Sequence, residues 1–266
     1  MQRIAIVGLG LIGSSIGMGL KRFHKGTIEI VGHDNEPTVA KRAQHRGAVD
    51  KVAWNLFSAV EEVSVVILAT PVMAIRDLME LIGPHLCDGC VVTDTGNTKQ
   101  AVMDWAAQYL PATVSFIGGD PLVMRGSPGT ENAQPDLFQD AMYCLIPDQR
   151  AHPDAVRLVT DMVKDLGGRP YYIDAVEHDS YAAAVNHLPV AVVTALVSTL
   201  SQSAGWRDIS KQAASPFQDV TALVSVDPLD NLDACIANKD ALLHWMDQYI
   251  IQLYTYRKLI QESSFA

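Results

Sequence analysis

Three glycines near the start of the chain have the spacing of a phosphate-binding turn. Gly8, Gly10 and Gly13 follow the apolar run 4–7 and precede a helical pattern over 14–23. In such a unit the first glycine permits the tight turn, the second lets a pyrophosphate approach the backbone, and the third lets the helix pack closely. The free amides and the dipole at a helix start also favour an anion. This spacing predicts a dinucleotide site formed by Gly8, Leu9, Gly10, Leu11, Ile12 and Gly13.

An acidic residue stands where recognition of a ribose needs one. Asp34 follows the predicted strand 28–33 and lies about 20 residues after Gly13, where a carboxylate accepts hydrogen bonds from ribose hydroxyls and repels a 2′-phosphate. NAD is therefore favoured over NADP. Lys41 and Arg42 follow about two helical turns later and could reach a 2′-phosphate, which keeps NADP open as the less favoured cofactor. A glycine-rich turn without a ligand, with Asp34 as an ordinary strand-end residue, is the structural alternative.

Two further motifs carry possible chemistry. Thr70 and Pro71 end the run VVILATP, and they are placed to line the nicotinamide side of the site because ligands bind beyond the carboxyl ends of parallel strands. They equally suit a plain turn from a strand into a helix that starts with proline. Cys87 and Cys90 form a CxxC pair, but no second CxxC or HxxxH completes a metal site. No metal is predicted, and a turn is the favoured interpretation of this pair.

Short β-branched runs alternate with helical patterns up to about residue 175, which is typical of βαβ units around a parallel sheet. Strands are predicted at 3–7, 28–33, 63–69, 91–94, 115–118, 141–146 and 169–173. Helices are predicted at 14–23, 36–46, 72–82, 98–109 and 153–166. The fold class is therefore α/β, with a Rossmann-type doubly wound parallel sheet.

After this region the strand signals stop and the apolar spacing becomes helical, over 182–200 and 241–260. We expect a Rossmann domain that binds NAD(P) at 1–174 and an all-α helical domain for substrate binding and dimerisation at 175–266. The helices carry more apolar residues than a peripheral pair should expose, which predicts a homodimer formed through the helical domain.

Composition narrows the class of partner. Of the 266 residues, 48% are hydrophobic and 19% charged, which favours a compact globular protein, and the net charge of −10 disfavours nucleic acid and anionic lipid as partners. The apolar stretch 188–200 is too short to cross a bilayer, and no charged segment with a long apolar run opens the sequence. A cytoplasmic protein with a small-molecule substrate and no membrane association is expected.

Several motifs in order along the chain resemble those of the prephenate/arogenate dehydrogenase family. They are IVGLGLIGSSIG at 6–17, LATPV at 68–72, VTDTGNTK at 92–99, FIGGDP at 116–121, EHDSYAAAVNHLP at 177–189 and ANKDALL at 237–243. The resemblance implies a Rossmann domain, a helical domain that dimerises, and NAD(P)-dependent oxidative decarboxylation of a cyclohexadienyl carboxylate in tyrosine biosynthesis. In that reaction a hydride leaves the carbon that bears the hydroxyl, and a base takes the hydroxyl proton.

The catalytic positions depart from the family pattern. Where the family has histidine in a Gly-Gly-His-Pro run, this chain has Asp120, and where the family has a serine near the substrate hydroxyl, it has Asn97. A carboxylate has an ordinary pKa of about 3.9, against about 6.5 for imidazole, so it is the weaker base unless its surroundings change. Asp120 either serves after such tuning or marks altered chemistry. Asn97 is the milder change, because an amide still donates and accepts hydrogen bonds.

The substrate positions depart as well. The arginine that grips the substrate carboxylate in the family is replaced by Gln218, and a second arginine four positions later is replaced by Ala222. A neutral amide cannot form the bidentate charged contact of a guanidinium. Arg125 could supply a relocated positive charge, or it could be a solvated loop residue. His187 matches the family's histidine on the substrate side, and its alternative is a hydrogen-bonded core residue.

Three functions remain open from the sequence. The first is a dehydrogenase of the prephenate dehydrogenase-like class. The second is a divergent dehydrogenase or reductase that acts on another small substrate, with Asp120 or His187 as proton donor. The third is a dinucleotide-binding protein without turnover.

Overall fold

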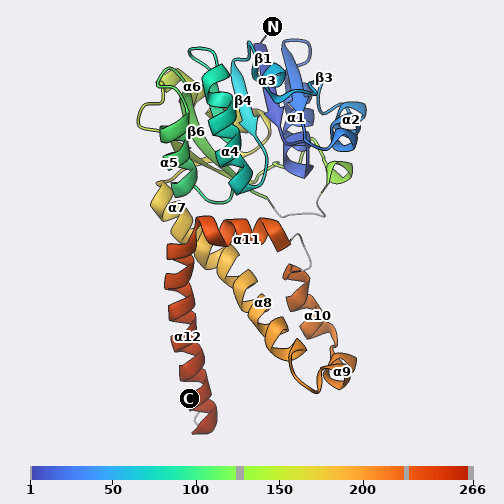
Figure 1. Cartoon of the computed structure of the whole chain (residues 1–266), viewed down its shortest axis with the longest axis vertical. Helices are drawn as coiled ribbons and strands as arrows, with labels where there is room; N and C mark the ends of the chain where they lie inside the picture. Colours follow the sequence, from blue (N-terminus) through green and yellow to red (C-terminus); the bar gives the residue numbers. More distant parts are fainter. Residues whose placement is uncertain (1, 124–128, 225–227, 263–266) are drawn as a thin grey trace. The chain divides into compact units, whose positions relative to one another are not determined.

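A computed structural model describes residues 2–123, 129–224 and 228–262 (Figure 1). Contacts divide the chain into two compact units, Met1–Val176 and Glu177–Ala266. The first unit contains the sheet and the second is helical within its described residues. The α/β class with a Rossmann-type sheet and a helical C-terminal domain is confirmed.

The first unit is built on one eight-stranded sheet with the order β3-β2-β1-β4-β5-β6-β7-β8. The strands are β1 (Gln2–Val7), β2 (Ile28–His33), β3 (Lys51–Val52), β4 (Val65–Leu68), β5 (Val91–Asp94), β6 (Ser115–Leu122), β7 (Met142–Pro147) and β8 (Arg169–Tyr172). The order from β3 to β6 is that of a dinucleotide-binding sheet, with all neighbours parallel. The sequence analysis missed β3, because two residues are too few to show an alternating pattern.

The sheet is not parallel throughout. β6 and β7 pair in antiparallel fashion, and β7 and β8 run parallel to each other. The connection from β6 to β7 carries no long helix in its described part, and antiparallel neighbours need no crossover helix, whereas α6 makes the crossover from β7 to β8. The sheet is therefore mostly parallel, with one antiparallel pairing between β6 and β7.

Helices cover both faces of the sheet. They are α1 (Leu11–Phe23), α2 (Pro37–His45), α3 (Leu56–Val60), α4 (Val72–Ile82), α5 (Gln100–Tyr109) and α6 (Pro153–Asp165), with short turns η1 (Gly83–His85) and η2 (Thr130–Asn132). Alternate strand residues point to opposite faces, so Ile4 and Ile6 belong to the core under α1, α2 and α6. The central strands are buried on both faces, which explains their continuous apolar sequence.

The second unit consists of helices within its described residues. They are α7 (Ala175–Ala182), the π-helical turn η3 (Ala183–His187), α8 (Leu188–Ser201), α9 (Trp206–Ile209), η4 (Ser210–Gln212), α10 (Ser215–Thr221), η5 (Ala222–Val224), α11 (Pro228–Ala237) and α12 (Lys239–Gln261). The turn η3 joins α7 and α8 into one helix, Ala175–Ser201. The apolar stretch 188–200 is thus the second half of a longer element.

This long helix has 27 residues, and its apolar 18-residue window has a mean hydropathy of 1.6 and is only 17% buried. By length and composition alone it could cross a membrane, which is weak evidence because the core helix of a soluble protein passes the same test. Such an exposed apolar helix also suits a surface that packs against a second protein chain. The absence of membrane association therefore stays a prediction.

The buried face of β7 offers a direct test of the core. Leu145 is fully buried, whereas Leu81 on α4 is 51% exposed. We expect Leu145→Ala to lower the free energy of unfolding by about 3–5 kcal/mol, because it leaves a cavity. Leu81→Ala should change it by less than about 0.5 kcal/mol. Urea unfolding followed by circular dichroism measures both, and equal effects would contradict this packing.

Candidate functional site

The glycine turn after β1 has the backbone that a dinucleotide site requires. Gly8 has a φ of 92°, and a Cβ there would lie 2.4 Å from the Ala69 carbonyl oxygen. A Cβ on Gly13 would lie 2.0 Å from the Gly8 carbonyl oxygen, so neither position accepts a side chain. A Cβ on Gly10 would meet no protein atom within 4 Å, so the space in front of this residue is open.

The start of α1 faces this open space. No side chain of the described residues caps the helix at Gly10, and the first hydrogen bond of the turn runs from the Ser14 amide to the Gly10 carbonyl. The amides of Leu11, Ile12 and Gly13 therefore precede the first helical bond and are donors suited to a pyrophosphate. These observations fit a bound dinucleotide.

Asp34 is held in place at the carboxyl end of β2. One carboxylate oxygen accepts the Leu9 amide at 2.8 Å, and the other accepts the Glu36 amide at 2.9 Å. Each oxygen has a second lone pair, so the half-buried carboxylate still has acceptor capacity for ribose hydroxyls. Leu9 itself has a fully buried side chain in the core, and its amide is already used by Asp34.

Thr70 carries an unused polar atom at the same edge of the sheet. It follows β4, and its Oγ1 is buried without a hydrogen-bond partner among the described residues. A buried hydroxyl without a partner is costly, so this atom is suited to receive a hydrogen bond from a bound molecule. Pro71 is exposed and forms the N-cap of α4, as its alternative interpretation proposed.

The segment 130–134, which the sequence analysis did not identify, is hydrogen-bonded to the glycine turn and to α1. Thr130 is buried and donates from Oγ1 to the Leu9 carbonyl at 2.6 Å. The Gln134 amide donates to Ser15 Oγ on α1 at 3.0 Å. Nothing in the sequence signals these contacts, because they join positions about 120 residues apart without a recognisable motif.

A fully buried ion pair connects β5 to β6. Lys99 Nζ contacts Asp94 Oδ2 and donates to the Gly119 carbonyl at 2.8 Å, while the Gly119 amide donates to Asp94 Oδ1 at 3.0 Å. Burial raises the pKa of Asp94, and the Lys99 ammonium and the amides of Gly119 and Gly96 oppose that rise. The pair therefore holds both the backbone amide and the backbone carbonyl of Gly119.

Asp120 follows directly after this anchored glycine. It lies on the part of β6 that extends past the end of β5, and it is 5% exposed. Its direct neighbour across the ladder is Cys144, whose pKa is raised to about 12 by burial and by the Asp120 charge. Burial and the charges of Asp94 and Asp120 also raise the pKa of Tyr143. Asp120 is thus a buried carboxylate at the carboxyl edge that also carries the glycine turn.

Asn97 lies in the loop between β5 and α5, two residues before Lys99, and it is half-buried. The loop begins at Asp94 and ends at Lys99, so the ion pair fixes both of its ends. Asn97 therefore lies between the two residues of the ion pair in the sequence, and Asp120 follows the glycine that the pair holds.

Of the remaining predicted residues, His187 and Gln218 lie in the second unit. His187 is buried in the helical unit, in the π-helical turn, and its Nδ1 lies 3.4 Å from Asn238 Nδ2. Asn238 also donates to the Asp179 carbonyl at 2.7 Å, and His178 Nδ1 lies 2.9 Å from Asp179 Oδ1. Such π-helical turns are frequent at functional sites. His187 has both the position of a site residue and the contacts of a core histidine.

Two predicted substrate contacts gain no support from geometry. Gln218 on α10 is exposed and donates from Nε2 to the Ala213 carbonyl at 3.1 Å, within its own helical segment. Arg125 lies outside the described residues. The cation that would bind a substrate carboxylate is therefore not among the contacts that the structure describes at these two positions.

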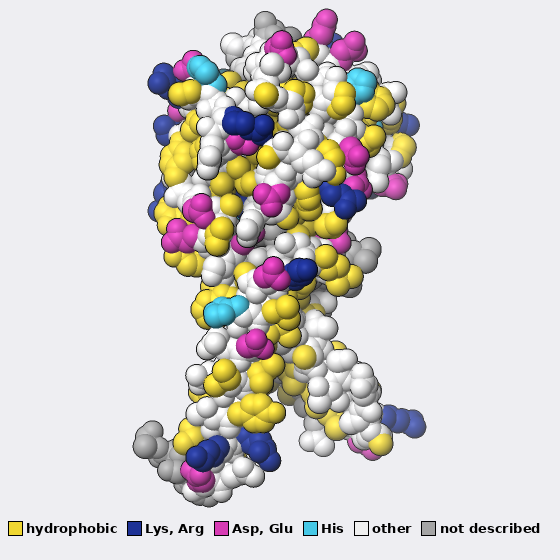
Figure 2. All heavy atoms as spheres, turned by 60° about the vertical axis from the view of Figure 1, so that its left-hand side comes forward, with side chains coloured by type: hydrophobic (Ala, Val, Ile, Leu, Met, Phe, Trp, Pro, Cys, Tyr) yellow, Lys and Arg dark blue, Asp and Glu magenta, His cyan; other side chains and the backbone are white. Residues whose placement is uncertain are grey.

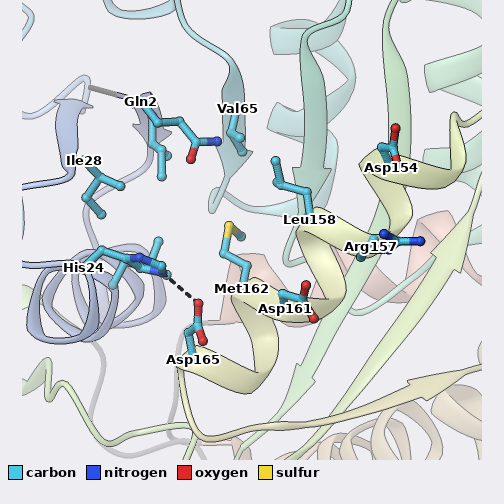
Figure 3. A pocket seen from close by; sticks show the side chains of 12 residues that line it. Gln2, His24, Ile28, Val65, Asp154, Arg157, Leu158, Asp161, Met162 and Asp165 are labelled. Carbon is cyan, nitrogen blue, oxygen red and sulfur yellow. Dashed lines mark hydrogen bonds and ion pairs between the residues drawn. The ribbon is translucent and has the colours of Figure 1, made fainter.

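A cavity of about 310 Å³ lies at the other edge of the sheet (Figure 3). Gln2, Ile28 and Val65, which line it, are the first residues of β1, β2 and β4, so it is at the amino ends of the strands. Figure 3 shows His24 and Asp165 pointing toward each other, with 2.7 Å between His24 Nε2 and Asp165 Oδ2. Because dinucleotides bind at the carboxyl ends, this cavity is separate from the candidate site.

The cysteine pair has no signs of redox chemistry. Cys87 is exposed and Cys90 is buried, and the Cys90 amide donates to the Cys87 carbonyl in a turn. Burial raises the pKa of the Cys90 thiol to about 12. A thiolate is the reactive form, so Cys90 is a poor nucleophile at neutral pH.

The buried ion pair generates a prediction for stability. Lys99→Met leaves the Asp94 carboxylate without its counter-charge, so we expect it to lower the free energy of unfolding by about 3–5 kcal/mol. Lys99→Met combined with Asp94→Asn should recover part of this loss, because no charge then remains buried. Thermal and urea unfolding measure both variants. A double variant less stable than Lys99→Met alone would show that the charge is not the cause.

Comparisons with known proteins agree with this geometry. Residues 16–172 match the family model "prephenate dehydrogenase, nucleotide-binding domain", and residues 174–265 match "prephenate dehydrogenase, dimerization domain". Prephenate dehydrogenase of Bacillus subtilis is 33% identical over 261 residues, which cover 97% of this chain and 70% of that protein.

Solved structures are similar over nearly the whole chain. Prephenate dehydrogenase from A. aeolicus, in complex with hydroxyphenyl propionate and NAD+, has a TM-score of 0.91 and 26% identity, and the match covers 99% of this chain and 92% of that one. Arogenate dehydrogenase from Synechocystis has a TM-score of 0.81 and 28% identity, with coverage of 98% and 93%. The two matching domains and the relatives confirm the resemblance that the motifs indicated, and the chain belongs to the prephenate dehydrogenase family.

Proposed function

We propose that this chain is an NAD-dependent dehydrogenase that oxidises and decarboxylates a cyclohexadienyl carboxylate, prephenate or arogenate, in tyrosine biosynthesis. The observation that carries the proposal is a buried carboxylate, Asp120, on the same edge of the sheet as an intact dinucleotide turn. Relatives named as prephenate and arogenate dehydrogenases support the substrate class.

The residues present fit NAD as the cofactor. The amides of Leu11, Ile12 and Gly13 suit the pyrophosphate, Asp34 suits the adenine ribose, and Thr70 offers an unused hydroxyl. Pro71 lies beside Thr70 on the nicotinamide side. When NAD is bound, it supplies a hydride acceptor for the substrate carbon that bears the hydroxyl. The A. aeolicus structure that contains NAD+ supports this choice.

Asp120 is the proposed proton acceptor. As the hydride leaves, the carbon–oxygen bond becomes a double bond and the hydroxyl proton moves to the Asp120 carboxylate. The bond to the carboxylate group then breaks and carbon dioxide leaves. Its bonding electrons complete the aromatic ring, the carbonyl π electrons return to the oxygen, and that oxygen takes the proton back from Asp120 to give the phenol. Asn97 is proposed to hydrogen-bond the same hydroxyl through its amide. The peptide unit at Gly119, held by Lys99 and Asp94, fixes the backbone from which Asp120 extends.

The substrate side is proposed to involve His187, Gln218 and Arg125. Of the two that the structure describes, His187 is buried and Gln218 is exposed, and His187 has hydrogen-bonding capacity for a substrate oxygen. Replacement of the family arginines by Gln218 and Ala222 favours a changed recognition of the substrate carboxylate. This change keeps a divergent dehydrogenase with another small substrate as the second candidate.

The helical unit is proposed to form a homodimer. Exposed apolar residues on α8, α11 and α12 include Leu196, Leu232, Ile236, Leu243, Ile250, Ile251, Leu253, Tyr254, Tyr256 and Ile260. Figure 2 shows hydrophobic side chains spread over the surface of this unit. Exposed apolar surface of this extent is typical of an interface, and the dimerization-domain match supports it. We place the domain boundary after residue 174 and the protein in the cytoplasm, as its biosynthetic relatives suggest.

The decisive test of the reaction is the formation of NADH. Purified protein is mixed with NAD and with prephenate or arogenate, supplied separately, and absorbance is followed over a range of pH. We expect turnover with one of the two. Asp120→Asn should lower kcat by about 10²–10⁴ with little change in KM, because the amide cannot accept the proton. NAD binding without turnover on either compound would favour the second candidate or a protein that only binds the dinucleotide.

Asp120→His supplies the control for this assignment. It introduces the family's imidazole, which acts as a base only when neutral, so activity should fall below a pH of about 6.5. Recovery of activity in Asp120→His but not in Asp120→Asn would identify the position as the proton acceptor. Equal rates for wild type and Asp120→Asn would refute it.

The dimer is tested by one charge placed on α12. Ile251 is 54% exposed, and Ile251→Lys should weaken self-association about a hundredfold, because an unpaired charge would be buried in the interface. Gln252→Lys adds the same charge at the exposed neighbouring position, on a different part of the helix surface, and serves as control. Sedimentation equilibrium measures both. A wild-type chain that is monomeric at micromolar concentration would contradict the proposal.

A further inference from the structure

The helix that follows the ribose carboxylate carries three cations, and each of them has a partner. α2 begins three residues after Asp34 and carries Lys41 and Arg42, with Arg46 at its C-cap. Lys41 and Arg42 are the two side chains that, from the sequence, could reach a 2′-phosphate. Such a phosphate is the only group that distinguishes NADP from NAD, so the partners of these cations bear on cofactor choice.

Each of the three cations contacts a protein group, although all three residues are exposed. Lys41 Nζ lies 5.8 Å from the centroid of the Trp54 ring. Arg42 Nη1 donates to Glu131 Oε2 at 2.6 Å. Arg46 donates to the carbonyls of Glu131 and Ala133 at 2.7 Å and 2.8 Å. The Glu131 carboxylate therefore binds the Arg42 guanidinium, and the Glu131 backbone carbonyl binds the Arg46 guanidinium.

The residue that precedes Glu131 is linked to Asp34 through hydrogen bonds to the backbone of Leu9. The preceding residue, Thr130, donates to the Leu9 carbonyl at 2.6 Å, and Asp34 accepts the amide of the same Leu9 at 2.8 Å. One residue of the glycine turn thus connects Asp34 to the segment that carries Glu131. A hydrogen bond from its own amide, followed by the bond and charge of Arg42, holds the pKa of Glu131 below its usual range. The carboxylate is ionised at neutral pH.

We propose that Glu131 is a second determinant of cofactor selectivity, which occupies Arg42 with its carboxylate, so that the site disfavours the 2′-phosphate of NADP. The inference rests on the proposed binding of NAD at the Gly8–Gly13 turn. Asp34 repels the phosphate directly, whereas Glu131 removes the guanidinium that would otherwise form a bidentate contact with it.

The size of the effect follows from exposure. The Arg42 and Glu131 side chains are 49% and 53% exposed, so their ion pair is screened by water and salt. An exposed pair contributes little, so we expect a change in NADP affinity of about fivefold. Glu131 therefore adjusts selectivity and does not replace Asp34 as the main determinant.

The test is a cycle of binding measurements on the full chain. Dissociation constants for NAD and NADP are measured by calorimetry for wild type, Glu131→Gln, Arg42→Gln and the double variant. We expect Glu131→Gln to tighten NADP about fivefold without changing NAD. The gain should vanish in the Arg42→Gln background and shrink at high salt, because it depends on the released guanidinium. Glu80→Gln, which removes an exposed charge from α4, is the matched control.

Two results would overturn the inference while leaving NAD binding intact. One is an equal change in NAD and NADP affinity in Glu131→Gln, which would indicate a structural role for the segment. The other is an NADP gain that persists without Arg42. A wild-type chain that binds neither dinucleotide would instead refute the cofactor assignment on which the inference rests.

Discussion

The position of the proposed catalytic carboxylate depends on one buried ion pair. Asp94 ends β5 and Lys99 ends the following loop, and together they hold the carbonyl and the amide of Gly119 on β6. Charges without solvent are costly unless they are paired and fully hydrogen-bonded, so this arrangement tolerates little displacement. The neighbouring residue Asp120 inherits that rigidity, and so do Asn97 and the loop that contains it. A proton acceptor needs a defined distance to its substrate, and the ion pair supplies the fixed backbone for it.

In the dinucleotide turn, Leu9 has a comparable role, because its side chain, its amide and its carbonyl each contact a different part of the first unit. Its side chain is buried in the core, its amide binds Asp34, and its carbonyl accepts Thr130. The turn, the ribose carboxylate and the segment that carries Glu131 therefore form one hydrogen-bonded assembly. The sequence keeps the glycine spacing and the Asp34 of a dinucleotide site, whereas Gln218 and Ala222 stand where the resemblance to the family implies arginines.

Much of the fold could be predicted because it depends on local signals. The glycine spacing, Asp34 and the alternation of strands and helices all report short-range geometry, and the structure has the corresponding elements. The two-residue β3 was missed because it is too short to show a pattern. The strand β7 was predicted, but its antiparallel direction was not, because an apolar run does not show the direction in which a strand pairs. The burial of Lys99 and the contacts of Thr130 and Glu131 depend on residues distant in sequence, so no local pattern reveals them. Arg125 lies outside the described residues, and Gln218 donates to the carbonyl of Ala213, just before its own helix begins.

The contacts of Thr130 and Gln134 with the glycine turn have a consequence for the order in which the protein is made. The turn at Gly8 leaves the ribosome before its covering segment, which follows about 120 residues later. Contacts of such long sequence separation form slowly, because the intervening chain must be ordered first. The nascent chain therefore carries an incomplete nucleotide site until most of the first unit has been synthesised. Any ligand that binds this site stabilises the finished unit in preference to its precursors.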